Sequence, residues 1–221
     1  MAANSGGGPV FVDRHDAGVR LAERVREAVS DENVVVVGLP RGGVPVAFEV
    51  ARALGAPLDV IVVRKLGVPF QPELGFGAIG EGGVRVINAG VVQMAHLTRG
   101  RWLGVTEDEQ AEVMRRASRF RRDRAPVDLA GRTVVVVDDG IATGGTARAA
   151  CQVARAHGAG RVILAVPVGP PETIESLRAD ADEVICLETP ADLFAIGFWY
   201  RDFTQTTDDE VIELLGRSTG A

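Results

Sequence analysis

Four consecutive valines lead directly into two adjacent aspartates, and this feature most constrains how the 221-residue chain can fold. Val134 to Val137 are β-branched and uninterrupted, a pattern typical of a strand buried on both faces of a parallel sheet. Asp138 and Asp139 follow where the valine run stops, so they are expected at the carboxyl end of the strand. In open α/β sheets, ligands bind at this edge. The run therefore predicts a buried strand with a polar site at its end.

The residues after the two acids form a loop of small and hydroxyl side chains that opens a helix. Segment 141–146 reads Ile-Ala-Thr-Gly-Gly-Thr, and the helical pattern after it stops at Gly158. Backbone N–H groups converge at such a helix N-terminus, and the helix dipole favours an anion there. The Walker motif GxxxxGK[ST] does not occur in the sequence. An acidic turn that only caps a helix is the alternative, but two carboxylates beside an anion site suit a phosphorylated sugar.

The stretch VVVVDDGIATGGT resembles the signature of the type I phosphoribosyltransferases, which bind 5-phosphoribosyl-1-pyrophosphate (PRPP), and points to a bacterial branch of unassigned substrate. It matches at nearly every position, with Gly140 where a branched apolar residue is more common. The resemblance implies that Asp138 and Asp139 engage the ribose 2′- and 3′-hydroxyls. The residues that it implies for the 5′-phosphate are Ala142, Thr143, Gly144, Gly145 and Thr146.

Length and composition predict one domain at 10–221, behind a disordered leader at 1–9. The net charge of −6 argues against a general nucleic-acid binder, which carries a basic footprint. No apolar run approaches the ~18 residues of a membrane span, and no signal peptide is seen, so a cytoplasmic protein is expected. Cys151 and Cys186 lie far apart in apolar segments and are expected to be buried free thiols.

Strands alternate with helices along the chain, which predicts an α/β fold with a doubly wound, mostly parallel sheet. Strands are expected at 33–38, 58–63, 134–137 and 161–168, and a short helix plus a strand at 171–187. Helices are expected at 16–30, from 43 to Gly55, at 106–122 with a capping box of Thr106 and Glu109, and at 206–215. Residues 73–88 read as a hairpin. The resemblance adds a small hood over the carboxyl edge, mainly 191–215.

The segment 38–47 repeats the order of strand, small-residue loop and helix. Arg41 supplies charge there, and Gly42 and Gly43 permit a close backbone approach. An ordinary turn with an exposed arginine is the alternative. The family places its pyrophosphate loop after the first core strand, so the resemblance implies that these residues bind pyrophosphate.

Lys65 is the single lysine among the 24 lysines and arginines of the chain. Its retention indicates that a compact point charge is needed, although chance is the alternative. Arg64 and Lys65 are expected at the end of the second strand, where related enzymes carry basic residues that meet the pyrophosphate, in some cases from a neighbouring subunit. A homodimer is therefore expected. The stretch 66–83 is predicted to hold a mobile loop that closes the site.

The segment 189–205 is rich in aromatic side chains and resembles the hood of the 6-oxopurine phosphoribosyltransferases. The resemblance implies that Phe194 stacks on the base and Asp202 reads its edge; a hydrophobic plug between hood and core is the alternative. The 6-oxopurine enzymes have an acid in the phosphate loop where this chain has Ala142, as adenine enzymes do. Hypoxanthine or guanine is therefore not expected as the base by the usual route.

The arginine cluster at 115–124 lies at a predicted helix C-terminus, where cations complement the dipole. The acidic residues upstream balance it, so we expect a solvated or subunit-contacting face and no nucleic-acid site.

The resemblance implies a pentosyl transfer in which a nitrogenous base displaces pyrophosphate from C1 of PRPP. Catalysis is expected to be mainly positioning and electrostatics by Asp138, Asp139, Lys65 and Arg41. Mg²⁺ is the expected cofactor, held mostly by substrate and water with help from the two aspartates. Two alternatives keep the fold without turnover: a regulator that senses PRPP or a nucleotide, and a partner-binding protein that retains only the phosphate loop.

Overall fold

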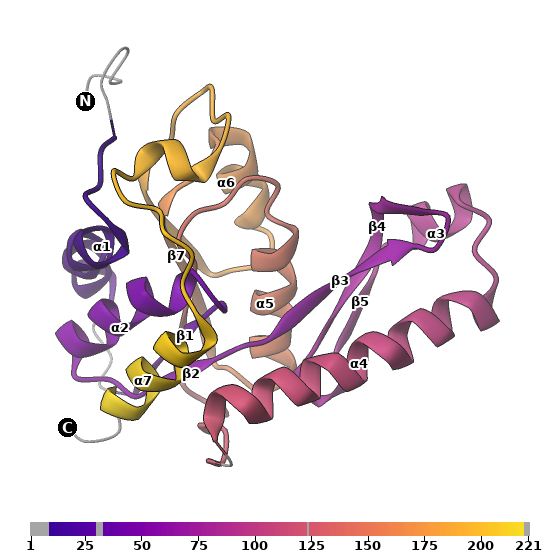
Figure 1. Cartoon of the computed structure of the whole chain (residues 1–221), viewed down its shortest axis with the longest axis horizontal. Coiled ribbons are helices and arrows are strands. Elements are labelled where there is room, and N and C mark those ends of the chain that lie inside the picture. Colours follow the sequence, from indigo (N-terminus) through magenta and orange to yellow (C-terminus); the bar gives the residue numbers. More distant parts are fainter. Residues whose placement is uncertain (1–8, 30–32, 123, 219–221) are drawn as a thin grey trace.

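A central parallel sheet organises the computed structural model, which describes residues 9–29, 33–122 and 124–218 (Figure 1). Its five described strands lie in the order β2 (Leu58–Val60), β1 (Val34–Gly38), β6 (Thr133–Val137), β7 (Arg161–Val168) and β8 (Glu183–Glu188). Every neighbouring pair in this sheet is parallel. The predicted α/β fold with a mostly parallel sheet is confirmed. The leader predicted at 1–9 falls outside the described residues except for Pro9.

Helices cover both faces of the sheet. The core on one face contains side chains of α1 (Arg14–Ala28), α2 (Gly43–Leu54) and α7 (Asp208–Ser218). The core on the other face contains side chains of α5 (Gly145–Ala156) and α6 (Pro171–Leu177). Val135 and Val137 belong to the first core, whereas Val134 and Val136 belong to the second. The valine run is therefore buried on both faces, as its sequence predicts.

An antiparallel sheet and two helices form an arm, residues 63–121, that extends from the central sheet (Figure 1). Its elements are β3 (Val63–Val68), β4 (Gln71–Gly80), the 3-10 turn η1 (Glu81–Gly83), β5 (Arg85–Ile87), α3 (Ala89–Met94) and α4 (Arg99–Arg121). β4 and β5 are the predicted hairpin, and β3 pairs with the other edge of β4. Gly82 and Gly83, at φ of 67° and 75°, form the turn between β4 and β5.

The prediction of one strand at 58–63 is wrong. β2 ends at Val60, the chain leaves the parallel sheet, and β3 pairs with β4 instead. Arg64 and Lys65 consequently lie within β3 and not at the end of the second strand. The stretch 66–83, predicted to hold a mobile loop, consists largely of paired strands, because its alternating apolar residues are buried in the arm.

The predicted start of the helix at 106–122 is also wrong. α4 begins at Arg99, and Thr106 is buried inside it, with its hydroxyl donating to the carbonyl of Leu103 at 2.6 Å. The helix runs through Gly100 and Gly104 without a break. A mid-helix hydroxyl bonded to the preceding turn resembles a capping residue in sequence alone.

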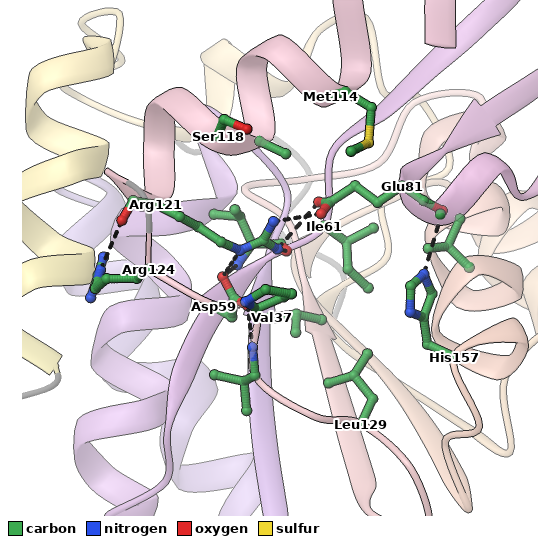
Figure 2. Close-up of a pocket in the computed structure, with 16 residues that line it drawn as sticks. Val37, Asp59, Ile61, Glu81, Met114, Ser118, Arg121, Arg124, Leu129 and His157 are labelled. Carbon is green, nitrogen blue, oxygen red and sulfur yellow. Dashed lines mark hydrogen bonds and ion pairs between the residues drawn. The ribbon is translucent and has the colours of Figure 1, made fainter. Parts of the chain in front are cut away.

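Arg121, in the last turn of α4, connects the arm to the central sheet through buried ion pairs (Figure 2). Its Nε donates to Asp59 Oδ1 at 2.8 Å, and its Nη1 donates to Glu81 Oε2 at 2.5 Å. Its Nη2 also donates to the carbonyl of Val60 at 2.8 Å. A cavity of about 440 Å³ adjoins this network. The expectation of a solvated face at 115–124 is therefore wrong for Arg121.

Both carboxylates of this network also accept backbone hydrogen bonds. Asp59 Oδ2 accepts from the N–H of Val127 at 2.9 Å, and Glu81 Oε1 accepts from the N–H of Val62 at 2.9 Å. Burial acts to lower the pKa of Arg121, but the hydrogen bond with Glu81 and the charge of Asp59 outweigh it and raise the pKa. The guanidinium is thus a fixed charge that three segments of the chain share.

We predict that Arg121→Met lowers the free energy of unfolding by about 3–5 kcal/mol, because it leaves two buried carboxylates without their cation. Urea denaturation followed by circular dichroism measures the change. Arg115→Met is the matched control on the same helix: its exposed side chain pairs with Glu112, and its loss should leave the free energy of unfolding almost unchanged. Equal losses in the two variants would contradict the assignment.

Candidate functional site

The loops after β1 and β6 lie side by side at the carboxyl edge of the sheet, because the two strands are parallel neighbours with Gly38 opposite Val137. A Cβ at Gly42 would lie 2.0 Å from Asp139 Oδ2, and one at Gly43 would lie 2.7 Å from the carbonyl oxygen of Val137. A larger residue would push the loops apart. The structure therefore brings the glycines of the predicted pyrophosphate loop to the acid pair.

Asp138 and Asp139 are partly buried at this edge. Asp138 Oδ1 accepts a hydrogen bond from the backbone N–H of Asp139 at 2.9 Å. Burial, together with the charge of Asp139, raises the pKa of Asp138 well above its usual range. Burial also raises the pKa of Asp139, and the charge of Arg14 opposes that rise. Among the described residues Asp139 alone of the two forms an ion pair, so the two acids are not equivalent.

Arg14, the first residue of α1, belongs to this site and was not predicted from the sequence. Its Nε and Nη2 both lie 2.8 Å from Asp139 Oδ2, and its Nη1 donates to the carbonyl of Thr204 at 2.8 Å. Its guanidinium lies 3.9 Å from the centroid of the Phe203 ring. The hydroxyl of Tyr200 donates to the carbonyl of Asp139 at 2.6 Å. A cation in the first turn of a helix, which the dipole disfavours, was the one available signal.

The residues expected to bind the 5′-phosphate, 142–146, form the start of α5 and the loop before it; we call them the phosphate loop. Gly144 has φ 75° and occupies the position before the helix, where no described side chain caps the N-terminus. Thr143, Gly145 and Thr146 are exposed. The first N–H groups of a helix have no partner within it. The phosphate loop thus presents backbone donors at the start of a twelve-residue helix.

Gly140 is explained by its surroundings. A Cβ there would lie 2.6 Å from a side-chain carbon of Ile196, in the 3-10 turn η2 (Ile196–Trp199), and 3.0 Å from one of Val168. A branched apolar residue, more common at this position in the family signature, would displace that turn. The C-terminal segment therefore packs directly onto the loop after β6 at this point.

Lys65 faces the phosphate loop across a cavity of about 360 Å³ between the arm and α5. It lines this cavity together with Thr143, Gly145 and Thr146. Arg64 lies on the other face of β3, since successive side chains of a strand alternate, and its Nε donates to Glu109 Oε2 of α4 at 2.7 Å. The structure therefore brings Lys65, but not Arg64, to the phosphate loop.

Arg41 lies in the same loop as Gly42, and its Nη1 is 3.6 Å from Asp208 Oδ1 at the start of α7. Asp208 Oδ2 is also 3.0 Å from Nη1 of Arg119 in the arm. The Arg41 side chain is about one-third exposed. The Arg41 guanidinium therefore lies near Asp208 at the start of α7, whereas the backbone of its loop lies beside Asp139.

The expected hood segment, 191–215, divides into two parts in the structure. Its first part packs beside the acid pair: Tyr200 is buried against Phe11, with Ile196 and Phe203 partly buried around them. Its last part, α7, packs against α2 and α4.

Phe194 does not belong to the hydrophobic plug, since its side chain is 89% exposed. Asp202 Oδ1 accepts hydrogen bonds from the backbone N–H and the hydroxyl of Thr204, which lower the pKa of Asp202. The plug is formed instead by neighbouring side chains of the same segment. Phe194 is therefore open to a planar ligand, whereas Asp202 is engaged in its own loop.

Other features bear on cofactors and on the cysteines. Within the described ranges, no three or more histidine, cysteine, aspartate or glutamate side chains group as a metal site. No helix of the described part is both long and apolar enough to span a bilayer. Cys151 and Cys186 are free, and burial raises the pKa of each thiol to about 12.

We predict that Asp138→Asn raises the unfolding midpoint Tm at about pH 8. Burial raises the native pKa of Asp138 above the ~3.9 of an unfolded chain, so native stability is lost as pH rises between the two values. Asparagine does not ionise, and its advantage should disappear as pH falls below that interval. Asp139→Asn should raise Tm less than Asp138→Asn, because the pair with Arg14 opposes the effect of burial on Asp139. A Tm gain for Asp138→Asn that is independent of pH would contradict this assignment.

The chain is similar in sequence to several known proteins. A Mycobacterium tuberculosis (strain H37Rv) protein provisionally described as a phosphoribosyl transferase is 61% identical over 209 residues, which are 95% of this chain and 47% of that protein. The chain thus spans about half the length of that curated relative. A uracil phosphoribosyltransferase of Thermoanaerobacter sp. (strain X514) is 30% identical over 144 residues, 62% of this chain and 65% of that enzyme.

The solved structure of TT1426 from Thermus thermophilus is 44% identical, with a TM-score of 0.82 over 93% of this chain and 97% of that one. The family model described as phosphoribosyl transferase domain matches residues 14–75 and 84–202. These ranges include Arg14, both loops at the sheet edge and Lys65. Because the model matches most of the chain and the matched loops meet at one edge of the sheet, the chain belongs to the phosphoribosyl transferase domain family.

Proposed function

We propose that this chain transfers the 5-phosphoribosyl group of PRPP to a nitrogenous base and releases pyrophosphate. The observation that carries the proposal is the meeting of three groups: the acid pair, the glycines at 42–43 and the N-terminus of α5. A sugar with a phosphate at one end and a pyrophosphate at the other needs this combination of acceptors and donors. Membership of the family supports the same chemistry.

Each part of PRPP is assigned to residues along the carboxyl edge of the sheet. The 5′-phosphate accepts from the N–H groups of the phosphate loop and from the hydroxyls of Thr143 and Thr146. The ribose hydroxyls donate to Asp138 and Asp139. Arg14 contacts only Oδ2 of Asp139, so the other oxygen can accept from the sugar.

The reaction breaks the bond between C1 and the pyrophosphate oxygen and forms a bond from C1 to a nitrogen of the base, whose proton passes to the released pyrophosphate or to solvent. Positive charge develops on the ribosyl ring, and the nearby carboxylates favour it beyond ground-state binding. Negative charge leaves with the pyrophosphate, which the Gly42–Gly43 backbone, Arg41 and Lys65 would stabilise. The chain mainly positions the reactants.

Mg²⁺ fits the residues of this edge. Mg²⁺ usually keeps several waters and takes one or two carboxylates plus substrate phosphates, so a dedicated cluster of three protein ligands is not required. Asp138 and Asp139 would hold it, and it would neutralise part of the pyrophosphate charge when bound. The anion carries more charge than Arg41 and Lys65 can balance.

We propose the identity of the base only as a chemical class, a planar nitrogenous ring. The exposed ring of Phe194 supports stacking on a planar base, and Asp202 would read the base only after leaving Thr204. Ala142 argues against the usual 6-oxopurine route. The similarity to a uracil enzyme makes a pyrimidine one member of the panel to be tested. The homodimer also stays a prediction, which sedimentation velocity of the purified chain would test.

We predict that Asp138→Asn weakens PRPP binding by about 1.5–3 kcal/mol, since it removes a charge-assisted hydrogen bond to the ribose. This corresponds to roughly 10- to 150-fold in Kd. Calorimetry with Mg²⁺ measures it, and EDTA should abolish binding to the wild type. Turnover should fall further than affinity. Unchanged PRPP binding by the variant, or equal wild-type affinity in EDTA, would overturn the ribose or the metal assignment respectively.

Labelled PRPP screened against uracil, adenine, hypoxanthine and other bases, with pyrophosphate release as readout, tests the function itself. Base-dependent release supports the transferase. Tight PRPP binding without release for any base would favour the sensing regulator, and absence of PRPP binding would contradict both.

We predict that Phe194→Ala weakens binding of the nucleotide product by about 1–3 kcal/mol, because the ring stacks on the base. Phe70→Ala is the matched control: Phe70 is also an exposed aromatic residue, but it lies in the arm, so its loss should leave nucleotide binding unchanged. Loss of affinity in both variants, or in neither, would contradict a base site at Phe194.

A further inference from the structure

We propose that Arg14 is a positioning residue for sugar binding: it holds the Asp139 carboxylate so that one oxygen stays turned to the ribose hydroxyls. The inference rests on the proposed function and adds to it a residue that lies outside the two loops of the signature. Arg14 is 125 residues from Asp139 in sequence. It reaches the acid from the start of α1.

The guanidinium is held from several sides, so it is a fixed part of the site. Two of its nitrogens lie 2.8 Å from Asp139 Oδ2, a third donates to the carbonyl of Thr204, and its central carbon lies over the ring of Phe203. The side chains of Arg14 and Asp139 are only 11% and 13% exposed. A cation buried between an acid, a carbonyl and an aromatic face is well satisfied and stays in place.

The contacts with Arg14 involve only one of the two oxygens of the Asp139 carboxylate. Both guanidinium nitrogens bind Oδ2, and rotation of the carboxylate would break both contacts. The last torsion of an aspartate is otherwise broad, so an unclamped carboxylate samples many orientations. Fixing it before the sugar arrives removes an ordering cost from binding. Tyr200 adds to this by fixing the backbone of Asp139.

The ion pair of Arg14 and Asp139 also lies against the expected pyrophosphate loop. A Cβ at Gly42 would come within 3.1 Å of Arg14 Nε and 2.0 Å of Asp139 Oδ2, so the ion pair touches the backbone of that loop. The pair therefore sits between the ribose and pyrophosphate ends of the site. A contact that served only to attach α1 to the segment 200–204 would not need Asp139.

The groups that face Asp139 come from three parts of the chain. They are Asp138 on its own loop, Arg14 from α1 and Tyr200 from the C-terminal segment, while Arg41 pairs with Asp208. Asp202 lies near Arg14 but is engaged with Thr204.

The experiment measures PRPP binding with Mg²⁺ by calorimetry, and the unfolding midpoint Tm, for the wild type, Arg14→Gln, Arg14→Lys and Arg24→Gln. Arg24 is the matched control: it is exposed on the same helix and pairs only with Glu27 in the described structure. We expect Arg14→Gln to lose about tenfold or more in affinity for PRPP. Arg14→Lys, which keeps the charge but not the two-nitrogen fork, should restore only part of that affinity.

Wild-type affinity in Arg14→Gln would overturn the inference while leaving the proposed function intact. A wild type that does not bind PRPP would overturn the proposed function, and the inference with it. If circular dichroism shows that Arg14→Gln does not fold, Phe203→Leu replaces it, because this variant removes the aromatic face under the guanidinium. Lower PRPP affinity of Phe203→Leu at unchanged Tm supports the positioning role, and unchanged affinity overturns it.

Discussion

The parallel pairing of β1 with β6 is the constraint on which the rest of the site depends. Their register places Gly38 opposite Val137, so both strands end at the same level and their loops leave the sheet together. Burial of β6 on both faces holds that register, because a shift by one residue would move each valine to the opposite core. The glycines after β1 can then touch the acids after β6.

The arm adds a charged group to the site that the central sheet does not carry. Lys65 reaches the cavity beside the phosphate loop only because β3 leaves the parallel sheet and turns toward α5. Arg121 holds the base of the arm through Asp59 and Glu81, and these three side chains are largely buried and linked by hydrogen bonds. Lys65, the third residue of β3, lies at the same end of the arm as this ion-pair network, because Val63 pairs with Gly80 and Lys65 with Ala78.

The acid pair is asymmetric, and its surroundings explain why. Asp138 is partly buried and has no ion-pair partner among the described residues, whereas the Asp139 side chain pairs with Arg14 and its carbonyl accepts a hydrogen bond from the hydroxyl of Tyr200. Two adjacent carboxylates would otherwise repel each other at the strand end. Neutralising one through a partner from α1 lets both remain at the edge where the sugar is expected. The C-terminal segment that supplies Tyr200 also fills the space that Gly140 leaves.

The sequence by itself determined the elements with local signals: the buried valine strand, the two acids after it, the glycine loops and the helix starts beside them. These signals depend on residue type and on spacing over a few residues, so they can be read before the tertiary structure is known. Only the tertiary structure decided the break after Val60, the true start of α4, the position of Lys65 and the roles of Arg121 and Arg14. Arg121 and Arg14 meet their acids across 62 and 125 residues of chain. Contacts over such distances leave no periodic pattern, because they arise only when packing has placed the elements.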